Sequence, residues 1–281
     1  MDQKQDNTAV VVKSPIDTVR DLLTRLKPQL MMALPKTLNA DRLIRIAVTS
    51  CQKNPMLLEC APVTLMGAIM QCAQLGLVPD GVLGEAYLIP YRNNAKNRME
   101  AQFQIGFKGL RKLVHNTGEI ETFLPQVVYE GDSFECSMAE ARIIKHDRTD
   151  ATQYGKPTHF YTVVKWKSGN VESWIMPRAE VDHVRDSFSQ AYRNATRSKR
   201  DDTPWIQHYE AMGMKTVMRK HGKYLPLSAE AQSALALDEK ADAGLPQDLG
   251  QLIDPAEAPT QENGTAPNGK DAIQEPRKRS E

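Results

Sequence analysis

The sequence predicts an α+β fold, with a helical N-terminal third followed by a small antiparallel β-sheet with packed helices. Apolar residues first recur at helical spacing. From about residue 86 apolar and polar residues alternate instead, with turn residues between the alternating stretches. The 281 residues, 41% hydrophobic and 25% charged, suffice for one large domain or two small ones. No apolar run approaches the roughly 18 residues of a membrane span, and the N-terminus does not resemble a signal peptide. We therefore expect neither a membrane protein nor a secreted one.

The N-terminal third is expected to hold three amphipathic helices. Residues 1–14 are polar and aperiodic, so we expect a disordered N-terminus there. Ser14 and Pro15 then supply an N-cap and a first helical residue, Asn39 caps a second helix, and a third begins near Pro62 and ends at Gly76. The apolar stripes of these helices are more typical of a core than of a chemical site.

The middle of the chain is expected to form the sheet. Residues 86–91 and 101–105 predict a β-hairpin with a polar, basic connection. Further elements are strands over 120–129, 141–145, 159–166 and 171–176, and helices over 109–115 and 177–186. An aperiodic, densely basic stretch covers 187–203, and from Thr203 a long helix reaches about Tyr224.

Charge divides the chain into a basic body and an acidic tail. Residues 86–226 hold 22 Lys and Arg against 16 Asp and Glu, whereas residues 227–281 hold 5 against 11. This asymmetry suggests a polyanion-binding body with a solvated appendage. After Tyr224 there are six prolines and no aromatic residue, so the tail cannot bury enough surface to fold alone. We expect a core over 15–228 and a largely disordered tail over 229–281, with one short helix near 229–237. Two roles stay open for the tail, to discourage unproductive DNA contact or to dock a partner.

Enzymatic chemistry has little support. Neither GxxxxGK[ST] nor GxGxxG occurs, and no HExxH motif or His/Cys cluster indicates a metal site. The four cysteines form no CxxC pair and lie in apolar contexts, which is typical of buried free thiols in a reducing compartment. Two carboxylate pairs, Glu130 with Asp132 and Asp201 with Asp202, could hold a nuclease metal, but a strand-end turn and a helix N-terminus explain them better. We predict a cytoplasmic protein that is not an enzyme and binds no metal.

Basic residues concentrate in three sets. They are Arg92, Lys96 and Arg98 at the hairpin tip, then Lys108, Arg111 and Lys112 after the second strand, then Arg193, Arg197, Lys199, Arg200, Lys215, Arg219, Lys220 and Lys223 in the basic stretch and the long helix. Such cations bind phosphates, and the rings of Phe107, Tyr192 and Trp205 could stack on the bases of a single strand. A solvated helix face is the better explanation for any single lysine, but the joint pattern favours nucleic acid.

One motif favours RNA. The segment Ile105-Gly106-Phe107-Lys108-Gly109 fits the IGxxG pattern of KH domains, whose GXXG loop clamps a nucleotide backbone. A KH loop joins two helices, whereas an alternating strand precedes this one, so the glycines could instead permit a tight strand-to-helix turn. A KH-like RNA-binding protein that uses the Gly106–Gly109 turn stays open as the alternative function.

Several ordered blocks resemble the RecT family of phage-type single-strand DNA annealing proteins, or recombinases. The blocks span about residues 30–228, and they are ALPK at 33–36, RLIR at 42–45, QCAQLGL at 71–77, GEAYLIP at 84–90, IGFKG at 105–109, EGD at 130–132, PW at 204–205 and KYLP at 223–226. The sequence departs from the family at His221 and Gly222, where an apolar run is expected. Gly222 costs a helix about 1 kcal/mol relative to Ala, so Lys223 is left out of the DNA-binding set.

The resemblance implies ATP-independent binding of single-stranded DNA and annealing of complementary strands in homologous recombination, by an oligomeric ring or helical filament. It implies helices and sheet around a basic groove, distantly similar to annealing proteins of the Rad52 type, with no cofactor and with Mg²⁺ only as a counterion. The implied partners are the annealed duplex, a RecE-type 5′→3′ exonuclease and host single-strand-binding protein. The DNA-binding positions carried over are Lys108, Arg111, Arg197, Lys199, Arg200, Lys215 and Arg219.

Overall fold

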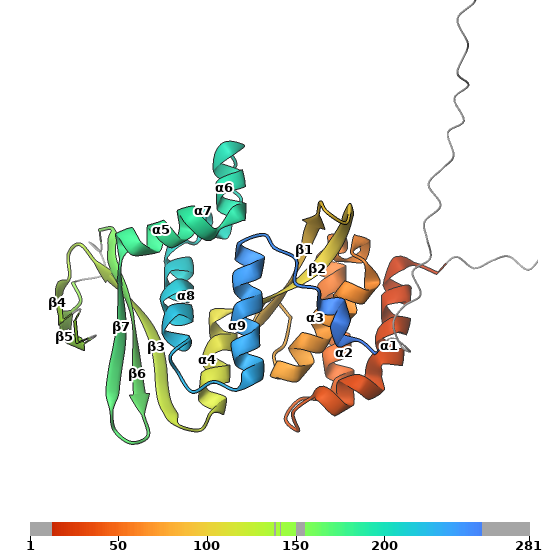
Figure 1. The fold of residues 1–281 in the computed structure, drawn as a ribbon, viewed down its shortest axis with the longest axis horizontal. Helices are drawn as coiled ribbons and strands as arrows, with labels where there is room; N and C mark the ends of the chain where they lie inside the picture. Colours follow the sequence, from red (N-terminus) through yellow and green to blue (C-terminus); the bar gives the residue numbers. More distant parts are fainter. Residues whose placement is uncertain (1–12, 138, 141, 150–154, 255–281) are drawn as a thin grey trace, which may run out of the picture.

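The N-terminal third is helical, as predicted. A computed structural model describes residues 13–137, 139–140, 142–149 and 155–254 (Figure 1). Its first elements are α1 (Pro15–Ala33), α2 (Ala40–Lys53), the 3-10 helix η1 (Pro55–Glu59) and α3 (Pro62–Leu75). The side chains of Ser14 and Asn39 accept backbone N–H bonds at the starts of α1 and α2, and Gly76 ends α3 at φ 64°. The caps expected from the sequence are confirmed. The expected disordered segment lies outside the described residues except for Lys13 and Ser14.

The predicted hairpin is confirmed as β1 (Ala86–Asn93) paired antiparallel with β2 (Arg98–Ile105). Side chains, instead of a third strand, bind the outer edge of β2. The side-chain amide of Gln247 accepts the N–H of Phe103 at 2.8 Å and donates to its C=O at 2.7 Å. Asp238 accepts the N–H of Ile105 at 3.1 Å. The hairpin is therefore held by residues more than 130 positions further along the chain.

The second sheet follows α4 (Phe107–Asn116) and has the strand order β3-β6-β7, all antiparallel. Its strands are β3 (Ile120–Tyr129), β6 (Pro157–Trp166) and β7 (Val171–Pro177), and the hairpin of β4 (Ser133–Ser137) and β5 (Arg142–Asp147) packs beside them. Phe160 and Met176 pack with the helices, whereas Tyr161 and Ile175 pack with the β4–β5 hairpin. The sequence missed β4, because five mostly polar residues carry too little alternation to predict a strand.

Two sequence expectations for the segment after the sheet are wrong. The stretch over 187–203 is not all loop, because α5 (Arg178–Phe188) is followed by α6 (Gln190–Arg197), which Ser189 caps at its N-terminus. The long helix expected from Thr203 is broken at His208 into α7 (Pro204–Gln207) and α8 (Tyr209–Gly222). His208 has φ −137° and ψ 50°, outside the helical region, so the helix cannot continue through it.

The boundary expected at residue 228 is also wrong. Helix α9 (Ala229–Asp242) and the 3-10 helix η3 (Leu249–Leu252) follow it, and Leu235, Leu249 and Ile253 belong to the main hydrophobic core. Figure 1 shows α9 between α8 and the first hairpin. The folded core therefore extends to residue 254, and the rest of the expected tail lies outside the described residues. Within the described chain, no helix is long and apolar enough to cross a membrane.

Candidate nucleic-acid interface

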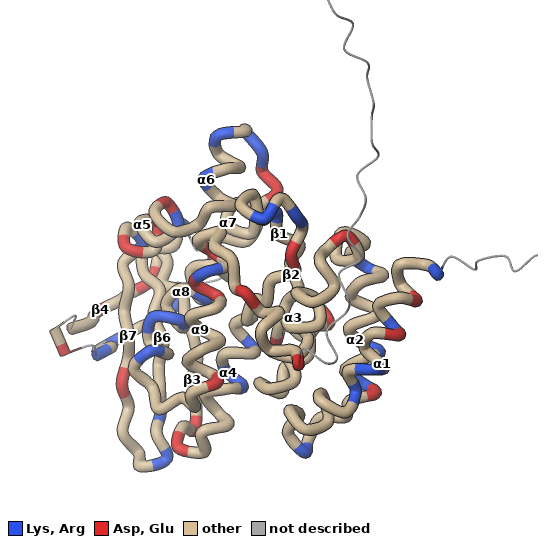
Figure 2. Tube along the Cα trace, turned by 45° about the vertical axis from the view of Figure 1, so that its right-hand side comes forward, with Lys and Arg blue, Asp and Glu red and all other residues tan. Residues whose placement is uncertain are grey.

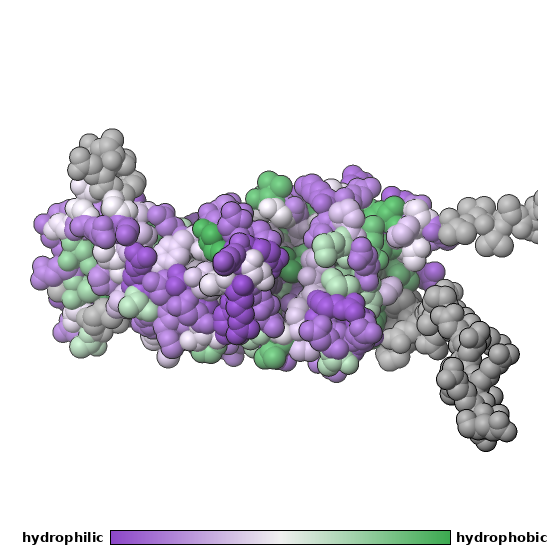
Figure 3. Space-filling model, turned by 90° about the horizontal axis from the view of Figure 1, so that it is seen from above, coloured by the Kyte–Doolittle hydropathy of each residue, from purple (hydrophilic) through white to green (hydrophobic). Residues whose placement is uncertain are grey.

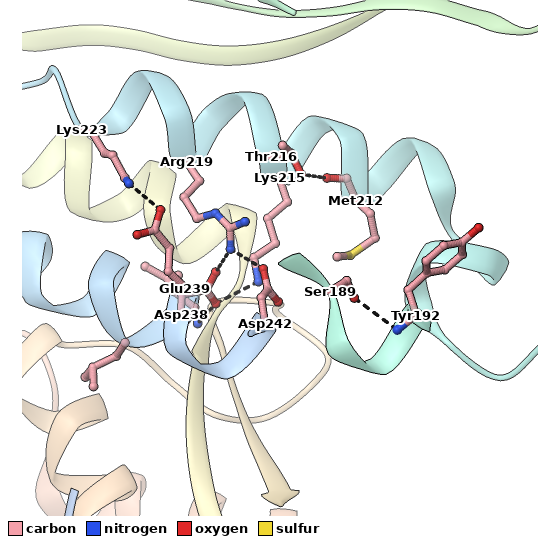
Figure 4. A network of polar contacts seen from close by, with 12 residues as sticks. Ser189, Tyr192, Met212, Lys215, Thr216, Arg219, Lys223, Asp238, Glu239 and Asp242 are labelled. Carbon is pink, nitrogen blue, oxygen red and sulfur yellow. Dashed lines mark hydrogen bonds and ion pairs between the residues drawn. The ribbon is translucent and has the colours of Figure 1, made fainter. Parts of the chain in front are cut away.

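The cations expected on an open face of α8 are buried in a network with α9 (Figure 4). Lys215 Nζ lies 2.9 Å from Asp238 Oδ1, and an Arg219 guanidinium nitrogen lies 2.8 Å from Asp238 Oδ2 and also pairs with Asp242. The side chains of Lys215, Arg219 and Asp238 are 14%, 9% and 0% exposed. Buried charges require such partners. Lys215 and Arg219 therefore hold the fold together, and their assignment as DNA ligands is corrected.

The sequence misplaced these two cations because their partners lie in the segment expected to be disordered. Burial opposes the charge of Arg219, but the carboxylates of Asp242 and Asp238 more than offset it and raise the pKa of the guanidinium further. Burial would likewise raise the pKa of Asp242, but the charges of Lys215 and Arg219 hold that pKa below its ordinary value. Two cations and two anions thus neutralise each other between α8 and α9.

Two of the three cations at the hairpin tip are also paired. Lys96 lies 2.8 Å from Asp248, and Arg98 lies 2.8 Å from the buried Glu100. Arg92 is exposed and donates to the side-chain oxygen of Asn97 instead of a carboxylate. Of this set, Arg92 offers a positive charge that no carboxylate of the described chain neutralises.

The glycine turn at 106–109 joins β2 to α4, so it does not connect two helices as a KH loop does. The N–H of Gly106 donates to the C=O of Glu85 at 2.9 Å. A Cβ at Gly106 would lie 1.9 Å from the carbonyl oxygen of Gly84, and one at Gly109 would lie 2.0 Å from that of Glu85. Both glycines are needed because the 84–85 backbone packs directly on the start of α4.

Lys108 and Arg111 project from the first turns of α4 and are exposed. Neither has an ion-pair partner in the described part of the chain. The neighbouring Lys112 differs, since it lies 3.0 Å from Glu85 and donates to the C=O of Gly76 at 2.9 Å. Phe107 is half-buried against the main core. The structure thus leaves two free cations at this turn.

Helix α6 stands out from the body of the molecule, and basic residues lie at its end (Figures 1 and 2). Arg197 and Lys199 are exposed, and among the described residues no carboxylate pairs with them. Arg200 is exposed and lies 3.3 Å from the equally exposed Asp202, a pair of little energetic weight. At the end of α6, the side chains of Arg197, Lys199 and Arg200 therefore present positive charge to solvent. From above, this face is mainly hydrophilic, with scattered hydrophobic areas (Figure 3).

The aromatic residues expected near the basic stretch are less available than the sequence suggested. Trp205 is 5% exposed and packs with Phe160 and Val217, so it cannot stack on a base. The guanidinium of Arg185 covers the half-buried Tyr192 ring, 4.6 Å from its centroid. The assignment of Trp205 as a stacking residue is therefore wrong.

A groove between α5, α8 and α9 carries Lys220 and Lys223 of the third basic set together with one further cation, Lys240. It has a volume of about 530 Å³, and its lining includes the lysines 220, 223 and 240 with the exposed side chains of Phe188 and Leu245. Lys223 Nζ lies 2.5 Å from Glu239, whereas Lys220 and Lys240 have no carboxylate at ion-pair distance within the described residues. The helical spacing of Ala231, Ala234 and Leu235 was the signal that could have placed Lys240 on a folded helix.

The carboxylate pairs and the cysteines have structural positions. Asp132 accepts N–H bonds from Tyr129 and Thr149, each at 2.8 Å, and contacts His146, so it orders the turn after β3. No group of three or more metal-binding side chains occurs among the described residues. Three cysteines are buried and Cys136 is half-buried, and all four are free thiols. Burial raises the pKa of Cys51 to about 11.

Comparisons with known proteins give the family. The model of the RecT family matches residues 41–250. Protein RecT of Escherichia coli K12 is 37% identical over 217 residues, which cover 76% of this chain and 77% of that protein. The uncharacterized protein YqaK of Bacillus subtilis 168 is 25% identical over 228 residues, 79% of this chain and 70% of that protein. The matched region includes α9, in agreement with the packing of that helix into the core, and the chain belongs to the RecT family.

Proposed function

We propose that this protein anneals complementary single strands of DNA during homologous recombination, without ATP and as an oligomer. Membership of the RecT family supports DNA binding, single-strand annealing and DNA recombination. The structural observation that carries the proposal is the set of exposed cations on α4 and at the end of α6, Lys108 and Arg111 with Arg197, Lys199 and Arg200. The groove lysines 220 and 240 add two further cations.

Phosphate contacts suit this activity because they bind any sequence. Each lysine or arginine that contacts a phosphate releases a counterion, so affinity falls as salt rises. Four phosphates per protomer would give a slope of about −3 for log K against log[salt] on a single strand. Base pairing itself supplies the free energy of annealing, so no nucleotide cofactor is required, and Mg²⁺ would act as a counterion that screens two polyanionic strands.

The first test follows two complementary fluorescent oligonucleotides mixed with the full chain, without ATP and with EDTA in one arm. We expect duplex to form faster than without protein, and the strands to keep their full length. Strands that are bound but never annealed would contradict the proposal. Shortened strands in the arm with divalent metal would contradict the expectation that this chain is not an enzyme, and Asp132→Asn would then test the carboxylates.

The wider setting belongs to the same proposal. A protein of this kind would work in the cytoplasm, would receive single strands from a RecE-type 5′→3′ exonuclease, and would meet host single-strand-binding protein on them. Size-exclusion chromatography with light scattering, with and without a single strand, tests the ring or filament. A particle that stays monomeric on long single strands would contradict an oligomeric mechanism.

A further inference from the structure

We propose that the stacked rings of Tyr224 and Trp174 form a binding site for one nucleobase of the bound single strand. This inference rests on the proposed function, because it concerns a strand that the cations already hold. It adds a contact to the bases, whereas the cations of the proposed function would contact phosphates. The site lies at the C-terminal end of α8, beside the edge strand β7.

Three rings lie in series from the core to the surface. His221 is buried, and its ring centroid lies 6.0 Å from that of Trp174, with 30° between the planes. Trp174 in turn stacks on Tyr224, with 4.7 Å between centroids and 22° between planes. Tyr224 is 70% exposed. The outermost ring is therefore held nearly parallel to its neighbour while most of its own surface stays open to solvent.

The arrangement behind Trp174 is fixed. The two ring nitrogens of His221 contact the Thr162 hydroxyl at 2.7 Å and the carboxylate of Glu172 at 3.4 Å. These contacts anchor the end of α8 to β6 and β7. The aromatic stack is thus preorganised, and a base that stacks on it needs to order few protein side chains.

The rings line a pocket of a size that suits a nucleotide. The pocket has a volume of about 640 Å³, within the usual range for small-ligand sites, and Trp166, Trp174 and Tyr224 are among its lining residues. The carboxylates that line the pocket already have partners. Glu172 contacts His221, and Glu140 lies 3.9 Å from the guanidinium of Arg142. A base also presents donors and acceptors at its edge, which the polar side chains of this lining can meet.

Consecutive residues connect this pocket to the lysine groove. Lys223 contacts Glu239 of α9 and lines the groove, and Tyr224 stacks on Trp174 of β7. A strand whose phosphates follow Lys220 and Lys223 would therefore run beside the end of α8 that carries the Tyr224 ring. This continuity with a positive surface favours a nucleobase over an apolar side chain of a protein partner.

The test compares a mixed-sequence single strand with an abasic strand of the same length and phosphate number. Binding of the full chain is measured by anisotropy, and quenching of its tryptophan fluorescence is recorded in parallel. We expect Tyr224→Leu to bind the natural strand with an affinity that is lower by about fivefold or more. A loss of about fivefold is the lower end of what one base–aromatic stack contributes. The same variant should bind the abasic strand as tightly as the unaltered protein does. Tyr224→Phe should retain both affinities. In the leucine variant an apolar side chain still shields Trp174 from solvent. The variant therefore distinguishes stacking of a base on the Tyr224 ring from mere shielding of Trp174.

The outcomes separate the site from the function on which it rests. Equal weakening of both strands by Tyr224→Leu, or no weakening of either, would overturn the base site while DNA binding itself stands. Loss of self-association in Tyr224→Leu with unchanged affinity for short strands would assign the rings to a second copy of this chain and overturn the inference. Failure of the unaltered protein to bind either strand would instead overturn the proposed function.

Discussion

The guanidinium of Arg219 donates to the fully buried carboxylate of Asp238 across 2.8 Å, and the same carboxylate accepts from Lys215 and from the backbone of Ile105. One side chain of α9 thus joins α8 and the β2 edge. In this way a pattern that looks like a DNA-binding stripe on an isolated helix becomes an internal contact of the folded protein.

Asp238→Ala should destabilise the fold by about 3 kcal/mol or more, because it leaves buried charges without a partner. The matched control is Glu239→Ala on the same helix, which removes the half-exposed partner of Lys223 and should cost less than about 1 kcal/mol. Urea unfolding followed by circular dichroism measures both. A similar loss in free energy of unfolding in the two variants would show that the buried network contributes no more to stability than the exposed ion pair does.

Stability should also fall in acid through Asp242. In the folded protein the pKa of Asp242 lies below its value of about 3.9 in the unfolded chain. The ionised carboxylate therefore contributes its full share of the folding free energy above about pH 5. This contribution is lost as the pH falls below the unfolded pKa and through the folded pKa. The difference in free energy of unfolding between the unaltered chain and Asp242→Asn should therefore shrink between about pH 6 and pH 3. A difference that stays constant over this range would contradict the assignment.

The double variant Lys108→Ala with Arg111→Ala should weaken single-strand binding and make the salt slope less steep by about 1.4, because two phosphate contacts are lost. Its thermal unfolding should match that of the unaltered protein, since both side chains are exposed. Lys53→Ala, an exposed lysine on α2, is the control for a general change of charge. An unchanged slope would remove α4 from the interface.

Two glycines on helices should respond to alanine in opposite ways. Gly109→Ala should destabilise strongly, because the new Cβ would lie 2.0 Å from the backbone oxygen of Glu85. Gly222→Ala should be neutral or stabilise by up to about 1 kcal/mol, because alanine favours the helix and its Cβ would lie at an ordinary 3.7 Å from the side chains of Leu110 and Leu235. Thermal unfolding of both variants checks this pair. A tolerated Gly109→Ala would reopen the possibility that the glycine turn serves a ligand instead of packing.

Truncation after residue 228 should abolish folding, whereas truncation after residue 254 should preserve both the cooperative unfolding transition and single-strand binding. The shorter chain lacks Asp238, Gln247 and the apolar side chains that α9 and η3 add to the core. Soluble yield and circular dichroism distinguish the two. Loss of binding in the longer chain would show that residues 255–281 contribute to the interface.

Local signals in the sequence were enough for the first half of the fold. The caps Ser14 and Asn39, the stop at Gly76 and the alternation on both sides of the hairpin turn act over a few residues, so each predicted its element. The exposure of the α4 and α6 cations was predictable for a similar reason, since exposed charge needs no tertiary partner to be recognised, and their binding to DNA stays a prediction. Family resemblance supplied what composition alone could not, the choice of single-stranded DNA.

The features that the sequence did not predict depend on distant partners. A short helix was expected near residues 229–237, but its place in the core was not, because α9 buries three alanines, Leu235 and Asp238. This surface is too weakly apolar to predict a core helix until Lys215 and Arg219 are placed opposite it. Trp205 seemed available for stacking because the cluster that buries it includes residues of the sheet, such as Phe160, which lies 45 positions earlier. In both cases the tertiary contact decides whether a charge or a ring is free.

The side-chain bonds of Gln247 to Phe103 set an order on synthesis of the chain. The outer edge of β2 leaves the ribosome 144 residues before the amide that covers it. Until then the nascent chain carries an open strand edge, which can pair with another strand and aggregate. Contacts over such long sequence separations also slow folding. A nascent chain that ends before residue 247 therefore leaves this part of the edge uncovered, and the native contacts of β2 are complete only after Gln247 has been synthesised.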